Sequence, residues 1–322
     1  MVDLALIFTG FILLARGAAW LVDGGATLAR RFGVSSLVIG LTVVAWGTSM
    51  PEIVVSGYAA FEGRPASSLG NVLGSNVANI GLVLGVCAMI LPSILLGRVQ
   101  QRERIWLLGS LAGLWMVCGD ARVTRPEALM LLVAFATYNL LVIRSPRAVA
   151  AEEADQGGEV QGVSWPWIIV MAGSLSIAGG AELVMRGAVG VAEAIGMSDR
   201  VVGLTIFALG TSLPELAAGV MSARRGEPEI GFGNVIGSNV FNVLAVMGVV
   251  GLIQPFEGDG ASAELRNALS SDFPVAMAFS VVLVALPLLF RKKVGTLPGA
   301  LLTVGYLAYM AWTSMDLWFP AR

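Results

Sequence analysis

The chain has 322 residues, of which 56% are hydrophobic and 13% are charged, and its formal net charge is −2. Soluble domains carry about a quarter charged residues, so this composition, with a mean hydropathy of +0.81, predicts an integral membrane protein. The balanced charge and the lack of a basic run exclude a typical nucleic-acid-binding protein, and the absence of histidine excludes imidazole metal ligands and a histidine general base.

Ten apolar segments are long enough to cross a bilayer, because about 20 apolar residues span a hydrocarbon core of about 30 Å. In chain order their approximate limits are 4–29, 36–61, 67–92, 104–120, 126–144, 165–193, 200–223, 229–253, 272–290 and 295–315. The first is longer than the apolar region of a cleaved signal peptide and lacks a basic stretch before it, so we expect it to remain as a membrane helix. Cys87 and Cys118 lie in apolar stretches, where we expect packing residues rather than a disulfide or a metal site.

The long polar stretch 145–164 reads SPRAVAAEEADQGGEVQGVS. Its content of Ala, Glu, Gly and Gln and its lack of aromatic residues are typical of a flexible linker. We therefore expect an all-α membrane protein of two five-helix halves, residues 1–144 and 165–322, joined by this linker.

Two stretches of the chain, Gly40–Val86 and Gly203–Val249, align without a gap at an offset of 163 residues and match at nearly half of their positions. Both keep the motifs G-T-S-x-P-E (Gly47–Glu52 and Gly210–Glu215) and G-N-V-x-G-S-N-V-x-N (Gly70–Asn79 and Gly233–Asn242). With five spans per repeat, an odd number, the second repeat must enter the membrane upside down. A duplicated membrane segment that carries a carboxylate is typical of a secondary transporter.

The Lys and Arg residues of the loops predict the orientation in the membrane. The loops after odd-numbered spans hold twelve of them, and the remaining loops and termini hold six. We therefore expect both termini outside and the 145–164 linker in the cytoplasm.

Each repeat places a glutamate, Glu52 or Glu215, near the middle of a long apolar span. A charged carboxylate at this depth costs about 2.5–3.5 kcal/mol on insertion scales, so both glutamates are candidate functional residues. Other charged residues within spans are simpler to explain. Asp23 and Arg186 occupy equivalent positions and are expected to snorkel near helix ends, and Glu182 is expected to be structural or interfacial.

Oxygen donors surround both glutamates in the sequence. Ala45 and Thr48 share a helical face with Glu52, and Pro51 lacks the amide that would bond the Gly47 carbonyl. The candidate ligands are Ala45, Thr48, Ser49, Glu52, Ser75 and Asn79 in the first repeat and Ala208, Thr211, Ser212, Glu215, Ser238 and Asn242 in the second. Calcium takes 6–8 oxygen ligands, and oxygen donors without thiolate or imidazole disfavour soft transition metals. Sodium would use the same ligand types.

The paired motifs resemble the α-repeats of the cation/Ca²⁺ exchanger superfamily, in particular its Na⁺/Ca²⁺ exchanger branch. The resemblance implies two inverted five-helix repeats with four cation sites at the midplane. It also implies a Ca²⁺ site shared by Glu52, Glu215 and the preceding threonines, and sliding of the first and sixth helices across the rest. The Na⁺ sites would use the positions Ala45, Ser49, Ser75, Ala208, Ser212 and Ser238. Ca²⁺ and Na⁺ would be transported ions, with no enzymatic activity, prosthetic group, nucleic acid or obligatory protein partner.

One position departs from part of that superfamily. Some members, including the K⁺-dependent branch, carry Asp where this chain has Asn242, so we expect no K⁺ co-transport. The short linker lacks the long regulatory insert of the animal exchangers, which favours a minimal prokaryotic form in the plasma membrane.

Other functions stay open at this point. In an antiporter for H⁺ and Ca²⁺, or another divalent cation, the two glutamates would carry protons, although protons would not need the additional hydroxyl and carbonyl oxygens. An intramembrane aspartyl protease also pairs two carboxylates, but such enzymes use Asp pairs. Inverted duplication around one site disfavours a passive cation channel.

Overall fold

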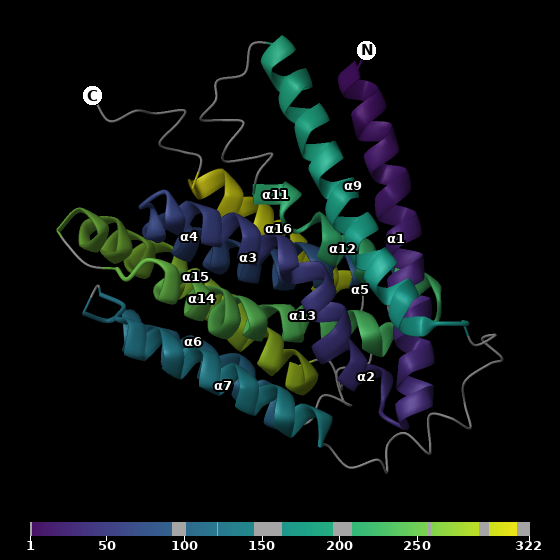
Figure 1. Cartoon of the computed structure of the whole chain (residues 1–322), viewed down its shortest axis with the longest axis horizontal. Helices are drawn as coiled ribbons and strands as arrows, with labels where there is room; N and C mark the ends of the chain where they lie inside the picture. The colour runs from purple at the N-terminus through teal and green to yellow at the C-terminus, as the bar shows by residue number, and fades with distance from the viewer. Residues whose placement is uncertain are drawn as a thin grey trace.

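The computed structural model describes residues 2–91, 101–120, 122–144, 163–195, 208–256, 259–289 and 296–313. These residues are nearly all helical, and the β-structure among them is an isolated bridge between Val123 and Phe256. Figure 1 shows the helices as one bundle, beside which α1 and α9 stand together at a steep angle. The fold is therefore that of an all-α membrane protein, as the composition predicts.

In chain order the described helices fall into two groups, one before residue 145 and one after residue 162. The first group is α1 (Val2–Phe32), α2 (Ser36–Ile39), the π-helix η1 (Gly40–Val44), α3 (Ala45–Phe61), α4 (Pro65–Ala78), the π-helix η2 (Asn79–Leu84), α5 (Gly85–Ile90), α6 (Gln101–Cys118) and α7 (Arg125–Ile143). The second group is α9 (Pro166–Ala194), α11 (Ala208–Gly210), α12 (Leu213–Arg224), α13 (Pro228–Phe241), the π-helix η5 (Asn242–Val246), α14 (Met247–Ile253), α15 (Asp259–Leu289) and α16 (Thr296–Thr313).

Seven of the ten expected spans coincide with helices of the described chain that are long and apolar enough to cross a membrane. They are Val2–Phe32, Ser36–Phe61, Ser67–Ile90, Arg125–Ile143, Pro166–Ala194, Pro228–Ile253 and Ala268–Leu286. The expected spans 104–120 and 295–315 correspond to α6 and α16, which have 18 residues each. The seventh expected span begins in 200–207, outside the described residues, and continues as α11 and α12. Residues 145–162 of the expected linker also lie outside them.

The turn between α3 and α4 has the same conformation as the turn between α12 and α13. Gly63 and Gly226 have φ values of +75° and +72°, a left-handed conformation that glycine adopts without steric cost at the end of a helix. Pro65 and Pro228 then begin α4 and α13, where the missing amide of proline leaves no helical bond unmade. The repeat seen in the sequence is thus a repeat of local structure.

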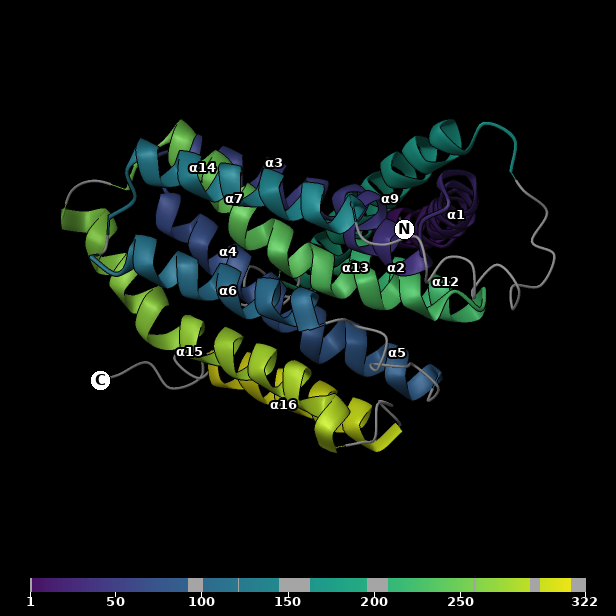
Figure 2. The ribbon, with the colours of Figure 1, turned by 90° about the horizontal axis from the view of Figure 1, so that it is seen from below.

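Helices α1 and α9 contact each other through glycines spaced seven residues apart, Gly10, Gly17 and Gly24 on α1 and Gly173, Gly180 and Gly187 on α9. A Cβ atom on Gly17 would lie 2.8 Å from the Gly173 carbonyl oxygen, and one on Gly173 would lie 2.7 Å from the Leu21 amide nitrogen. Small residues allow such close backbone contact between membrane helices. Figure 2 shows the two helices side by side at one end of the molecule.

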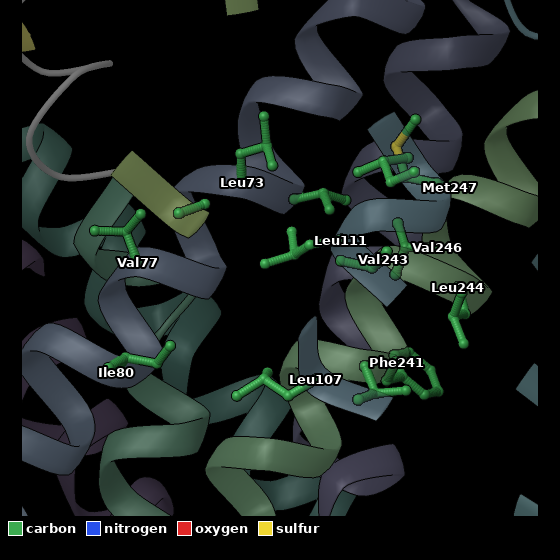
Figure 3. Close-up of a cluster of buried hydrophobic side chains, with 14 of the residues drawn as sticks. Leu73, Val77, Ile80, Leu107, Leu111, Phe241, Val243, Leu244, Val246 and Met247 are labelled. Carbon is green, nitrogen blue, oxygen red and sulfur yellow. The ribbon is translucent and has the colours of Figure 1, made fainter. Parts of the chain in front are cut away.

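The buried apolar side chains form two clusters. The larger one joins the central helices of both repeats and includes Leu73, Leu111 and Met247, which Figure 3 shows. The smaller one lies mainly between α1 and α9, with single residues from α2, η1, α12 and α13, and includes Leu21 and Ile177. The α1–α9 pair therefore has a packing core separate from that of the central bundle.

Candidate cation-binding site

The two candidate glutamates lie in the interior of the molecule. Glu52 is on α3 and Glu215 is on α12, and both are 0% exposed. The Ser49 hydroxyl donates a hydrogen bond of 2.9 Å to Glu215 Oε1. The two G-T-S-x-P-E motifs therefore meet in the fold, although 163 residues separate them in the chain.

The two motifs differ in backbone structure. Pro51 lies inside the continuous helix α3, and the π-helix η1 precedes this helix directly. In the second repeat α11 ends at Gly210 and α12 begins at Leu213, so that Thr211 and Ser212 lie in a turn. Nearly identical sequences thus adopt two different conformations at the site.

Thr48 and Ser238 meet at an asparagine that the sequence interpretation missed. The Thr48 hydroxyl contacts Asn234 Oδ1 at 3.0 Å and the Ala45 carbonyl oxygen at 3.3 Å, and the Ser238 hydroxyl contacts Asn234 Oδ1 at 3.4 Å. Asn234 is 0% exposed. The sequence signal that could have pointed to Asn234 is that the equivalent position of the first repeat is also an asparagine, Asn71. The Asn71 amide, however, donates to the Ser56 hydroxyl at 3.0 Å.

Four further asparagines form crossed pairs between the repeats. Asn79 Nδ2 donates to Asn239 Oδ1 at 3.1 Å, and Asn242 Nδ2 donates to Asn76 Oδ1 at 3.3 Å. Asn76 Nδ2 also donates to the Asn239 backbone carbonyl at 3.2 Å. Asn76 and Asn239 were not among the expected ligands. Asn79 and Asn242 are each the first residue of a π-helix, η2 or η5, a feature that is frequent at functional sites.

Several buried oxygens at this site have no hydrogen-bond partner within the described structure. They are both carboxylate oxygens of Glu52, Oε2 of Glu215, the hydroxyls of Ser75 and Ser212, and Oδ1 of Asn79 and Asn242. Buried polar atoms nearly always have a partner, so such a group of oxygens indicates a place for a ligand. Carboxylate, hydroxyl and amide oxygens together are the ligand set of hard cations.

Most expected ligands are buried and belong to one interior region. Direct contacts connect Ala45, Thr48 and Ser238, and likewise Ser49 and Glu215. Glu52 on α3, Ser75 on α4 and Thr211 and Ser212 in the turn before α12 are buried as well. Ala208 begins α11, but its side chain lies outside the described residues. Asp23 differs from the expectation of simple snorkelling, because it forms an ion pair of 3.0 Å with Arg225.

Known proteins resemble the chain over nearly its whole length. The family described as "Sodium/calcium exchanger protein" matches residues 2–144 and 165–315. The chain is 34% identical to the putative antiporter CaxA of Alkalimonas amylolytica, with 94% of this chain and 96% of CaxA covered. It is 29% identical to the sodium/calcium exchanger MaX1 of Methanosarcina acetivorans, with 88% and 90% covered. The solved structure of a sodium/calcium exchanger from Methanococcus jannaschii superimposes with a TM-score of 0.80 at 31% identity, covering 96% of this chain and 98% of the other. The chain belongs to the sodium/calcium exchanger protein family, whose members are membrane antiporters rather than enzymes.

Proposed function

We propose that this cation/Ca²⁺ antiporter moves Ca²⁺ against Na⁺ through ten membrane spans arranged as two inverted repeats, residues 1–144 and 165–322, joined by the linker 145–164. The buried pair Glu52 and Glu215 supports this proposal most strongly. Two carboxylates compensate the charge of one Ca²⁺ or of two Na⁺. The two cargoes therefore compete for the same negative charge, which is the requirement for exchange.

The proposed Ca²⁺ site lies between Glu52 and Glu215, with oxygens of Thr48 and Thr211 as further ligands. The proposed Na⁺ sites use the carbonyls of Ala45 and Ala208 and the hydroxyls of Ser49, Ser75, Ser212 and Ser238. Asn79 and Asn242 contribute neutral amide oxygens. The free oxygens of Glu52, Ser75, Ser212 and the two asparagines support this assignment, because each is buried and uncommitted to a protein donor.

The asymmetry of the site supports alternating access. Ser49 donates to Glu215, but its counterpart Ser212 makes no such bond to Glu52 in the described structure. Helix α3 is continuous, whereas its counterpart is interrupted between α11 and α12. Inverted repeats produce the second state of a transporter by exchanging their conformations around a fixed site. We propose that the α1–α9 pair slides across the bundle during this exchange.

Uptake of ⁴⁵Ca²⁺ into proteoliposomes tests the coupling ion. Vesicles loaded with Na⁺ should accumulate Ca²⁺ when external Na⁺ is removed, and a proton gradient without Na⁺ should drive no uptake. Uptake that follows the proton gradient would instead establish the alternative H⁺/Ca²⁺ antiporter. Uptake that requires neither gradient would contradict both.

We also propose a multi-pass protein of the plasma membrane with both termini outside, on the basis of the loop charges. Cysteines introduced by Asp155→Cys, Arg64→Cys and Arg266→Cys, in a chain without Cys87 and Cys118, report the sidedness. The first should react only from the cytoplasm and the other two only from outside. Labelling of position 155 in intact cells would overturn the orientation.

A further inference from the structure

Two asparagines outside the expected ligand set contact two asparagines inside it. Asn239 accepts the Asn79 amide and Asn76 accepts the Asn242 amide. All four side chains are at most 1% exposed. After these bonds form, Oδ1 of Asn79 and Oδ1 of Asn242 are left without a partner.

We propose that Asn76 and Asn239 are positioning residues that select one orientation of the Asn242 and Asn79 amides. An amide can rotate to present either its oxygen or its nitrogen. Because the acceptor oxygens of Asn76 and Asn239 bind the nitrogens, the oxygens of the ligand amides remain available to a cation. The inference rests on the proposed function, since it assigns these oxygens to transported ions.

Calorimetric Ca²⁺ binding and transport together test this role. Asn239→Leu should raise the Ca²⁺ dissociation constant by about fivefold to tenfold, the usual cost of one net hydrogen bond, with little change in the maximal rate. Asn71→Leu is the matched control, because it removes the bond to Ser56 outside the ligand set. In an Asn79→Ala background, Asn239→Leu should have no further effect on affinity, because the two residues act through one contact.

Full additivity of Asn79→Ala and Asn239→Leu would overturn the positioning role. So would equal losses of affinity in Asn239→Leu and Asn71→Leu. Absence of Ca²⁺ binding to the unmodified protein would instead contradict the proposed function.

A different set of contacts holds α1 against the bundle. Asp23 forms an ion pair with Arg225 at 3.0 Å, and Arg30 forms one with Glu227 at 3.7 Å. The Ser36 hydroxyl also donates to Glu227 at 2.8 Å. Both ion pairs join the last third of α1 to the turn between α12 and α13, on the side that the loop charges assign to the cytoplasm.

The equivalent positions in the other repeat carry the opposite charges. At an offset of 163 residues, Asp23 corresponds to Arg186, Arg30 to Glu193, Glu62 to Arg225 and Arg64 to Glu227. Each sign is reversed, so the equivalent pairs, Arg186 with Glu62 and Glu193 with Arg64, are again complementary. These residues lie on α9 and in the turn between α3 and α4, at the opposite end of each repeat.

The second set of pairs is not formed in this structure. Arg186 instead bonds Glu182 on its own helix at 2.6 Å. Glu62, Arg64 and Glu193 are exposed. Within the described residues, no ion pair joins Arg186 or Glu193 on α9 to the turn between α3 and α4. The open second set matches the asymmetry of the cation site, in which only one of two equivalent bonds is made.

We infer that the two sets are electrostatic latches that close in turn. The first latch, Asp23–Arg225 with Arg30–Glu227, holds the α1–α9 pair in the present state. The second latch, Arg186–Glu62 with Glu193–Arg64, closes when the pair has slid and the repeats have exchanged conformations. Glu182, whose counterpart in the first repeat is the neutral Ala19, forms an ion pair with Arg186 while the second latch is open. The inference rests on alternating access in the proposed function.

Trapping in membranes with a short bifunctional methanethiosulfonate reagent tests the second latch. The reagent joins two cysteines through reducible bonds and spans the gap that long ion-paired side chains leave, which is too wide for a direct disulfide. In a chain without Cys87 and Cys118, Glu62→Cys with Arg186→Cys should cross-link and stop exchange until a reductant is added. Asp23→Cys with Arg225→Cys should cross-link as well. Each trapped protein should bind ⁴⁵Ca²⁺ from one side of the membrane only, and the accessible side should be opposite in the two trapped proteins.

Charge reversal supplies a second measurement. Arg64→Glu should slow exchange by about twofold to fivefold, the range of an exposed ion pair, and Arg64→Glu with Glu193→Arg should restore the rate. The control Glu182→Gln should not slow closure of the second latch, because it removes only the competing partner of Arg186. Failure of the reversed pair to restore exchange would overturn the latch.

The outcomes separate the two levels of the inference. Intact Na⁺-driven Ca²⁺ flux with no cross-link between positions 62 and 186 under any ion condition would overturn the second latch and leave the function standing. Both cross-links in a chain that shows no such flux would leave the latches standing and contradict the function.

Discussion

Replacing Glu52 or Glu215 by glutamine should abolish Ca²⁺ transport and leave the fold intact. Both side chains are 0% exposed, so the carboxylate charge acts with little screening by water. At an effective dielectric of about 20, two unit charges about 4 Å apart attract by roughly 4 kcal/mol, and a divalent ion gains about twice that from one carboxylate. If desolvation offsets half of this gain, about 4 kcal/mol remains, which corresponds to a loss of nearly a thousandfold in Ca²⁺ affinity.

The two substitutions should differ in the ion-free protein. Neither carboxylate oxygen of Glu52 has a partner in the described structure, whereas Glu215 accepts a hydrogen bond from Ser49. Glu52→Gln removes an uncompensated buried charge and should raise the melting temperature without ions. Glu215→Gln should raise it less, because it weakens the bond to Ser49.

Calcium flux in proteoliposomes and thermal unfolding in detergent without ions check these expectations. Glu127→Gln is the matched control, since glutamine can still complete the capping box that Glu127 forms with Thr124 on α7. The control should transport normally. Substantial Na⁺-driven Ca²⁺ flux in Glu52→Gln or Glu215→Gln would refute the assignment of the site.

Three further outcomes are expected. Ser49→Ala should destabilise the ion-free protein by about 1–3 kcal/mol in chemical unfolding, whereas Ser212→Ala should not, because only Ser49 bonds a carboxylate; equal effects would contradict the asymmetry of the site. Gly17→Ala should lower the melting temperature and the flux, since overpacking costs about 1–3 kcal/mol, whereas Gly109→Ala should not, because within the described structure no side chain or neighbouring helix lies within 4 Å of the added Cβ; similar losses in both would show that the α1–α9 contact is not critical. Flux at a fixed Na⁺ gradient should persist when choline or Li⁺ replaces K⁺ on both faces, because Asn242 offers no charge for a monovalent ion, and a collapse of flux would show that this position does not decide K⁺ dependence.

The sequence was sufficient to predict most of the apolar helices and to single out two buried carboxylates as candidate site residues. Apolar segments of membrane length must be helical, because a bilayer leaves backbone groups no other partner, and seven of the ten expected spans are apolar helices of sufficient length in the described chain. A glutamate within such a segment is costly wherever the helix packs. Glu52 and Glu215 could therefore be identified before their neighbours were known.

Only the tertiary structure decided which partner each polar group has. Asn71 and Asn234 are equivalent in the sequence, yet Asn234 contacts Thr48 at the site and Asn71 bonds Ser56 away from it. The sequence around Asp23 predicts a snorkelling residue, but the fold brings the turn that carries Arg225 beside it, and the two form an ion pair. Hydropathy acts along one helix and can be seen in its sequence, whereas hydrogen bonds and ion pairs depend on distances between helices. Equivalent residues of the two repeats therefore differ in their contacts, because the two repeats adopt unequal conformations and give the same residue two different surroundings.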